Sequence, residues 1–223
     1  MKTIFTFFMM IVLSGYSILQ AQDKETYITT YIDFPLTWAN VSDNGLDLDG
    51  AVRFAPFFNV GNNVNVDFSE KVGFYGGWSI HNTGFIYDVD EFTRKKVRNY
   101  YFGIPLGLKF GNMDKGYVYA GYEVEFPFAY KEKTFVNEQK TKFNTWFSKR
   151  SAIQQSFTVG IQSPYGASLK FKYYFTNFYK QGYTESDGQG GTVQPYENFN
   201  ANIFWLSLTF ELFRGKYFVY IKE

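Results

Sequence analysis

The 223-residue sequence has no cysteine and a single histidine, His81. Without cysteine the chain cannot form disulfides, thiolate metal sites or a lipid-modified cysteine anchor. One histidine excludes multi-histidine metal sites and leaves one imidazole as a candidate base. Lys and Arg total 22 against 21 Asp and Glu, so there is no basic excess of the kind that nucleic-acid binding needs. With no phosphate-binding loop or dinucleotide motif either, we expect no nucleic-acid partner and no cofactor.

Long apolar runs are missing beyond the first 21 residues. Lys2 precedes an apolar run from Ile4 to Leu13, and small and polar residues follow as far as Ala21. This layout is typical of a cleaved secretory signal, and an uncleaved membrane helix is the alternative. We therefore predict a signal peptide over 1–21, cleavage after Ala21, and export of the mature chain.

Aromatic residues and two-residue alternation are abundant instead. Phe and Tyr number 27 and 19, and aromatics make up 22% of the chain, which is a large supply for an apolar surface. From Tyr100 to Phe110 the even positions are apolar, whereas the odd positions are small, polar or charged. Successive strand side chains point to opposite faces, so this pattern predicts a strand with one apolar face. It recurs in segments 28–38, 52–68, 74–81, 100–110, 118–128, 154–162, 167–176 and 204–212.

The apolar face carries no ionisable residue in any of these segments, while glycines, small polar groups and charges share the other face. A wide apolar exterior around a narrow polar interior is typical of a transmembrane barrel. A soluble lipocalin-like barrel, the alternative, would place its bulky apolar residues inside. We predict an all-β fold, a closed antiparallel up-and-down transmembrane β-barrel of about eight strands over 22–213.

Short and long connections alternate, as in outer-membrane barrels, where short turns are periplasmic and long loops are outside. The predicted short turns are 69–71, 111–115 and 163–165, and the long polar loops are 39–49, 88–96, 131–152 and 180–200. Segment 52–68 is longer than one crossing needs, so Gly61-Asn62-Asn63 is either a bulge or a turn. We expect residues 214–223 to be a periplasmic tail, with a ninth strand as the alternative.

Three stretches are less generic: Arg98–Phe110, Gly73–Gly77 and Trp146–Arg150. The first resembles the Tyr-x-x-Ile-Pro-Leu-x-Leu-Lys strand of the PorT-like outer-membrane β-barrel domain family, with the likeness strongest over about residues 50–180. The resemblance implies an outer-membrane location and eight strands, and it carries over no catalytic residue. Phe213 matches the terminal aromatic that outer-membrane assembly machinery reads, although ten residues follow it.

The polar face collects four cations and five carboxylates, which we expect to form an internal ionic network that fills a narrow lumen together with Tyr75, Tyr101 and Trp205. These charged residues are Arg53, Lys109, Lys170, Lys172, Asp33, Asp67, Glu123, Glu125 and Glu211. Glu123 and Glu125, two apart on one face, have a spacing suited to acid–base work, but an ion pair with lysine is the favoured interpretation. A small-solute channel is an alternative that would need more strands.

Two candidate surfaces remain. His81 and Ser79 suggest a lipid-modifying enzyme as an alternative, although both are predicted to face the lumen rather than lipid. The loop 131–152 carries cations and aromatics that suit lipopolysaccharide phosphates, with a solvated loop as the alternative. Its cations are Lys131, Lys133, Lys140, Lys142, Lys149 and Arg150. We expect a non-enzymatic outer-membrane barrel with a structural, envelope-integrity or surface-interaction role, whose partners are outer-membrane lipid, lipopolysaccharide and the assembly machinery.

Overall fold

The computed structural model describes residues 25–216. The wall of the fold consists of β1 (Glu25–Asp43), β5 (Val60–Asp67), β6 (Val72–Asp90), β7 (Thr93–Asn112), β8 (Gly116–Val136), β10 (Gln154–Gln162), β11 (Ala167–Tyr174) and β14 (Phe199–Lys216). No helix in this range is long and apolar enough to span a membrane. The predicted signal peptide and residues 217–223 lie outside the described residues.

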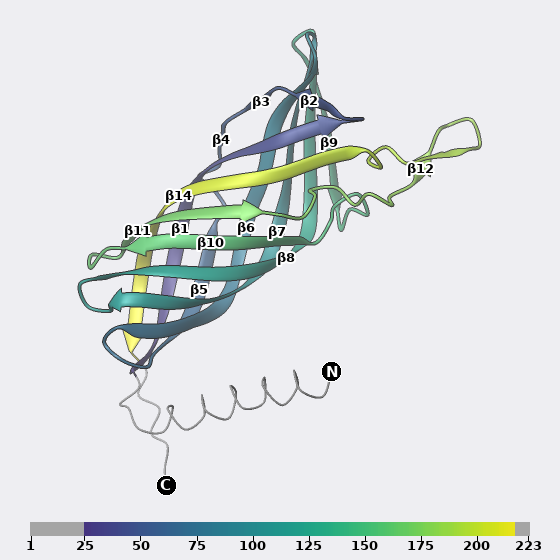
Figure 1. The fold of residues 1–223 in the computed structure, drawn as a ribbon. Coiled ribbons are helices and arrows are strands. Elements are labelled where there is room, and N and C mark those ends of the chain that lie inside the picture. The colour runs from purple at the N-terminus through teal and green to yellow at the C-terminus, as the bar shows by residue number, and fades with distance from the viewer. Residues whose placement is uncertain (1–24, 217–223) are drawn as a thin grey trace, which may run out of the picture.

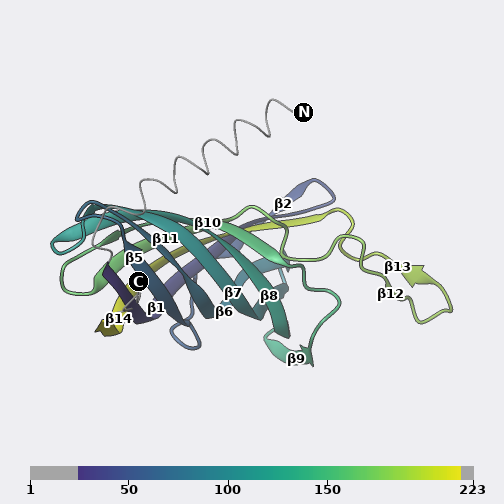
Figure 2. The ribbon, with the colours of Figure 1, turned by 90° about the horizontal axis from the view of Figure 1, so that it is seen from below.

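These eight strands form a closed barrel (Figures 1 and 2). Each pairs antiparallel with the next along the chain, β14 pairs with β1, and β10 pairs with both β8 and β11, so no wall strand has a free edge. Closure satisfies the backbone donors and acceptors that an open sheet would leave at its edges. The predicted up-and-down barrel of eight strands is confirmed.

The long second segment is interrupted, but not where the sequence suggested. Gly61-Asn62-Asn63 lies inside β5 and pairs with β1 and β6 without a register shift, so it is neither a bulge nor a turn. The break falls instead at 55–59. Before it, β4 (Arg53–Phe54) pairs with β1 and β3 (Gly50–Ala51) pairs with β6, which fills the wall above β5.

Three predicted loops are largely strand. In 39–49, β1 continues to Asp43 and residues 46–48 pair back with its end. The stretch 88–96 is the end of a hairpin in which β6 and β7 are separated only by residues 91–92, and 131–152 contains the end of β8 and all of β9 (Gln139–Trp146). Asn137 and Glu138 have φ of 45° and 66°, as a type I′ turn requires. Such a turn matches the twist of the strands, so the polar hairpin continues beyond the barrel wall (Figure 1).

The short turns lie between β5 and β6, β7 and β8, and β10 and β11, at the end where β1 begins and β14 ends. The opposite end carries β2 (Leu46–Leu48), the long hairpins, and the connection 175–198 with its small β12 (Glu185–Ser186) and β13 (Thr192–Val193) sheet. β14 runs three residues past Phe213, so 214–216 belong to the wall and not to a tail.

The apolar parity faces outward around the barrel. One cross-strand row contains Phe110, Val118, Ile161, Leu169, Leu208 and Phe34, and each side chain is 36–62% exposed. Along β7 the outward aromatic and apolar positions extend from Phe110 to Tyr100, which is about 33 Å of strand and about 23 Å of height at a 45° tilt. That height matches the apolar band of about 25 Å on outer-membrane barrels.

A bulge in β8 changes which residues face outward above this band. Tyr100 pairs with Ala129 and Tyr101 pairs with Pro127, so Phe128 has no partner in β7. An extra residue reverses the alternation that follows it. Below the bulge Val124 and Phe126 face out, whereas above it Lys131 and Lys133 do, because they pair with the outward Arg98 and Lys96.

Candidate functional site

The centre of the barrel holds a buried ionic cluster from β6, β8 and β11. Lys172 Nζ lies 2.7 Å from Glu123 Oε2 and 2.6 Å from Glu125 Oε1. All three side chains are at most 5% exposed. Charges this deep persist only where each has an opposite partner, because desolvation costs several kcal/mol per ion. The alternation that faces Lys172 inward on β11 also faces both glutamates inward on β8.

His81 lies in the same cluster. Its Nδ1 is 2.9 Å from Glu125 and its Nε2 is 3.5 Å from Asp33. Ser79 donates its hydroxyl hydrogen bond to Glu123 and lies 3.4 Å from His81 Nδ1. The imidazole is 1% exposed, so it faces the lumen as the sequence predicted and is walled off from the outer surface.

A second group centres on Asp33 of β1, which contacts side chains of the neighbouring β14 and of β11, one strand further along the wall. Lys170 Nζ is 2.9 Å from both carboxylate oxygens of Asp33. Thr209 and Ser207 also donate to Asp33 Oδ1. The structure thus brings five of the predicted network residues together in the middle of the barrel, and His81 joins them. These five are Lys170, Lys172, Asp33, Glu123 and Glu125.

Lys109 and Asp67 form a separate pair nearer the short turns. Lys109 Nζ lies 2.5 Å from Asp67 and donates to the Tyr27 hydroxyl at 2.9 Å. Its ammonium is also 4.8 Å from the Tyr27 ring centroid. The predicted network is therefore two sites, a central cluster and this pair, joined by no salt bridge within residues 25–216.

Two predicted members are not part of these ion pairs. Arg53 is buried, but it donates to the backbone and side-chain oxygens of Asn82 at 3.2 and 2.6 Å and has no carboxylate within 4.0 Å in the described chain. The break at 55–59 changes its surroundings, since Asn59 also binds Asn82. Glu211 is half-buried and lines the cavity described below without a salt bridge to any described residue.

His81, Glu123 and Glu125 offer ligand atoms within 4.8 Å of one another, a spacing that could hold a metal ion. Lys172 already takes the cation position, because its ammonium contacts both carboxylates. A divalent ion would have to displace a buried lysine from two ion pairs. The arrangement therefore fits a structural ion cluster better than a metal centre.

An aromatic layer closes the lumen on the long-loop side, and of its members the sequence analysis placed only Tyr101 and Trp205 in the lumen. Phe178 and Tyr179 from the connection after β11 pack against wall residues, and all six side chains are at most 5% exposed. The wall residues are Phe85, Tyr101, Phe199 and Trp205. Tyr196 stacks on Tyr179 at a centroid distance of 4.0 Å. Phe85 and Val97 have the inward parity of β6 and β7, but they lie outside the predicted strand segments 74–81 and 100–110.

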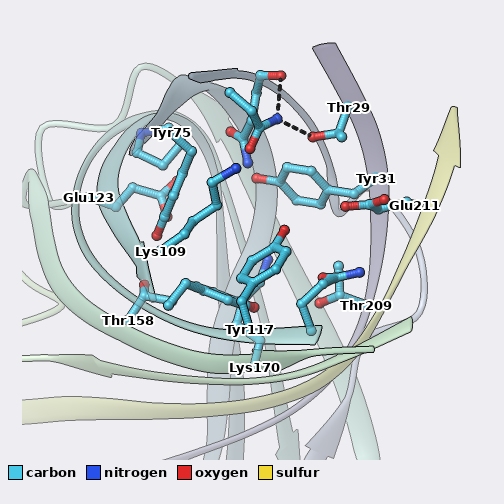
Figure 3. Close-up of a pocket in the computed structure, with 15 residues that line it drawn as sticks. Thr29, Tyr31, Tyr75, Lys109, Tyr117, Glu123, Thr158, Lys170, Thr209 and Glu211 are labelled. Atoms are coloured by element: carbon cyan, nitrogen blue, oxygen red, sulfur yellow. Dashed lines mark hydrogen bonds between the residues drawn. The ribbon is translucent and has the colours of Figure 1, made fainter. Parts of the chain in front are cut away.

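The space left in the lumen is small. A cavity of about 60 Å³ lies beside Tyr31, Tyr75, Tyr119 and Lys109, on the short-turn side of the central cluster (Figure 3). In Figure 3 Tyr75, Lys109, Tyr117 and Lys170 point into this common space from different strands.

The predicted lipopolysaccharide contacts divide into two groups. Lys131 and Lys133 on β8 and Lys140 and Lys142 on β9 share the outward face of the hairpin. Arg150 instead forms a 2.7 Å ion pair with Glu185, and Lys149 is exposed in the connection after β9. β7 adds two cations to the outward face that the prediction did not include, Lys96 at the end of the predicted loop 88–96 and Arg98 two residues after it.

No model of a known protein family and no curated protein matches the chain, so the resemblance to PorT-like barrels stays a prediction. Among solved structures, the chain is similar to the attachment invasion locus protein Ail of Yersinia pestis, at 12% identity over 87% of this chain and 98% of that one, with a TM-score of 0.37. It is also similar to Neisserial surface protein A, at 11% identity over 88% of this chain and 100% of that one, with a TM-score of 0.38. The outer membrane protein OprG of Pseudomonas aeruginosa is 10% identical over 90% of this chain and 100% of that one, with a TM-score of 0.35. At these values none of the three bears on what this chain does.

Proposed function

We propose that the chain is a non-enzymatic outer-membrane barrel with a structural, envelope-integrity or surface-interaction role. The support is physical. A closed eight-stranded wall carries an outward apolar row with side chains 36–62% exposed, and an apolar surface of this extent is stable only against lipid or another apolar partner. Outer-membrane lipid, lipopolysaccharide and the assembly machinery are the partners that we propose with it.

The observation that carries the proposal is the filled lumen. Charged pairs occupy the middle, the aromatic layer occupies the long-loop side, and the remaining cavity is about 60 Å³. Eight strands enclose an interior just wide enough for side chains to fill. A barrel filled in this way presents its outer wall and its loops to partners, which disfavours the channel alternative.

The lipid-modifying alternative has little support from the geometry. A lipid substrate would have to reach His81, which is 1% exposed. Ser79 donates to Glu123, and both ring nitrogens of His81 face carboxylates. These contacts hold the two residues in the ion cluster rather than present them at the outer wall.

The test combines location with conductance. The full protein expressed in a bacterium with an outer membrane is expected to fractionate with that membrane and to migrate faster on SDS gels when unboiled. The same preparation in planar bilayers is expected to show no sustained conductance. A soluble protein without heat-dependent mobility would overturn the membrane proposal, and stable single-channel steps would overturn the filled lumen.

A further inference from the structure

The outward face of β7, β8 and β9 carries two rows of cations above the apolar band. Lys96, Lys133 and Lys142 face one another across the three strands, and the next row down contains Arg98 and Lys131. Like charges directly opposite one another on a sheet are destabilising. Three lysines in one row therefore repel unless an anion lies between them.

Carboxylates of the chain do not supply that anion. None of these five cations has an Asp or Glu oxygen within 4.0 Å among the described side chains, whereas Arg94, the next outward position on β7, is paired with Asp88 at 2.6 Å. The nearby Glu132 lies on the opposite face with Tyr130. Burial and the neighbouring cations Lys140, Arg98, Lys96 and Lys142 lower the pKa of Lys133, as expected of a site whose counter-charge is missing.

An apolar groove adjoins the lower cation row. It has a volume of about 430 Å³ and is lined by Phe58, Ile80, Tyr100, Phe128, Lys131 and Trp146, among others. Trp146 stacks on Phe128 with ring centroids 6.3 Å apart, and Trp146 is 71% exposed. The β8 bulge at Phe128 creates the change of parity that sets Lys131 above this groove.

Tyr100 connects the cation rows with the apolar groove. The Lys131 ammonium is 5.0 Å and the Arg98 guanidinium 5.7 Å from its ring centroid. On β7 the outward series runs from Phe102 through Tyr100 to Arg98 and Lys96, so apolar, aromatic and cationic side chains follow one another along one strand. This is the order of environments met on leaving a bilayer, from hydrocarbon through interface to headgroup.

We propose that this surface binds a phosphate-bearing lipid of the outer leaflet, with phosphate between the cation rows and acyl chain along the groove. The inference rests on the proposed outer-membrane function and names the lipid class and the residues for it. Cations alone would suit any soluble polyanion, but the continuity of the rows with an apolar groove and the apolar band favours a lipid. Compared with the contacts predicted from the sequence, the proposed site includes Lys96 and Arg98 and no longer includes Lys149 and Arg150.

The test uses the full mature protein in phosphatidylcholine nanodiscs with and without lipid A. Lipid A is expected to raise the unfolding temperature, because a ligand that binds only the folded state stabilises it. In the triple variant Lys96→Gln, Lys133→Gln, Lys142→Gln, affinity for lipid A is expected to fall by about tenfold or more and the stabilisation to disappear. The matched control removes three exposed lysines outside these strands, Lys71→Gln, Lys115→Gln and Lys180→Gln, and should bind as wild type does.

A second arm separates lipid from soluble polyanion. Trp146→Ser is expected to weaken lipid A binding and to leave the binding of inositol hexakisphosphate unchanged. If the triple variant and its control lost the same affinity for lipid A, the cation rows would not be the binding site. Tight inositol hexakisphosphate binding with no effect of Trp146→Ser on lipid A would assign the surface to a soluble polyanion. Heat-dependent gel mobility of the same samples distinguishes these outcomes from failure of the barrel to insert, which would contradict the proposed function itself.

Discussion

Lys172 is the residue on which the interior charges depend most. It is buried and contacts Glu123 and Glu125 at 2.7 and 2.6 Å, so its removal leaves two carboxylates facing each other without a nearby ammonium. Asp33 has more hydrogen-bond donors around it, because Lys170, Thr209 and Ser207 all donate to it. The two lysines, equivalent in the sequence pattern, are therefore not equivalent in the fold.

We expect Lys172→Met to lower the free energy of unfolding by about 3–5 kcal/mol, the usual effect of leaving a buried charge unpaired. Adding Glu123→Gln and Glu125→Gln to that variant should restore much of the loss. Lys170→Met should cost less than Lys172→Met. Urea titration in lipid vesicles, followed by tryptophan fluorescence, compares these three variants with the wild type. Equal losses for the two single lysine variants would contradict this ranking.

Tyr75 packs flat on the inner wall because Gly107 and Gly121 have no side chain. A Cβ at either position would collide with the Tyr75 ring or hydroxyl. We expect Gly107→Ala to destabilise the barrel by about 1–3 kcal/mol through overpacking. Tyr75→Ala in the same chain should remove the added cost, as a double-mutant cycle on unfolding free energies would show; additive losses would mean that the two residues do not clash.

At the scale of the strand, alternation was predictable wherever it was unbroken. The outward Leu106 and Leu108 and the inward Lys109 on β7 follow directly from their parity, and so does the inward pair Lys170 and Lys172 on β11. The bulge at Phe128 was not predictable from alternation alone. Pro127, a residue that sheets tolerate at bulges and edges, was the signal that could have indicated it. Without the bulge, Lys131 and Lys133 would face the lumen.

The limits of strands were harder to predict than their faces. Residues 88–96 and 131–146 are polar enough to be loops, yet cross-strand pairing continues through them because two tight turns set the register. The break at 55–59 was missed since Phe54 and Phe58 keep the parity of Val60 across it. Arg53 lies beside this break, and its loss from the ion network follows from the same local irregularity.

The outward face of β7 gives a direct test of its environment. Leu106 is 48% exposed in the middle of the apolar band. We expect Leu106→Arg to lower the unfolding free energy in vesicles by about 2–4 kcal/mol if the site lies near the bilayer midplane. Val136→Arg, the same kind of change at an exposed position on the hairpin tip, should have almost no effect. Equal tolerance of both substitutions would indicate that the band faces water.

At the scale of the molecule, the lumen is closed by two different means. The ionic cluster came from charges that the sequence showed, whereas the aromatic layer depends on Phe178, Tyr179 and Tyr196 returning from a connection into the barrel mouth. No periodicity marks such residues, because they lie outside strands and meet the wall only after folding. The connection 175–198 is thus anchored near both ends.

Between those anchors the connection forms its own small sheet. β12 and β13 pair only with each other. We expect replacement of 186–192 by a short glycine linker to leave the unfolding temperature unchanged, since no wall strand loses a partner. Tyr179→Ala, which empties part of the aromatic layer, should cost about 3 kcal/mol. Heat-dependent gel mobility compares the two variants, and a large loss from the linker variant would assign the small sheet a structural role.

The pairing of β14 with β1 has a consequence for the order of events during biogenesis. Asp33 and Thr209, which meet across this seam, are separated by 176 positions in the sequence. Joining ends so far apart costs on the order of 5 kcal/mol in loop-closure entropy. The β1–β14 seam forms only after β14, the last strand along the chain, is present to pair with β1. Asp33 therefore gains its contacts with Ser207 and Thr209 only when β14 pairs with β1. A chain truncated before β14 would leave β1 and β11 each without the strand that joins them.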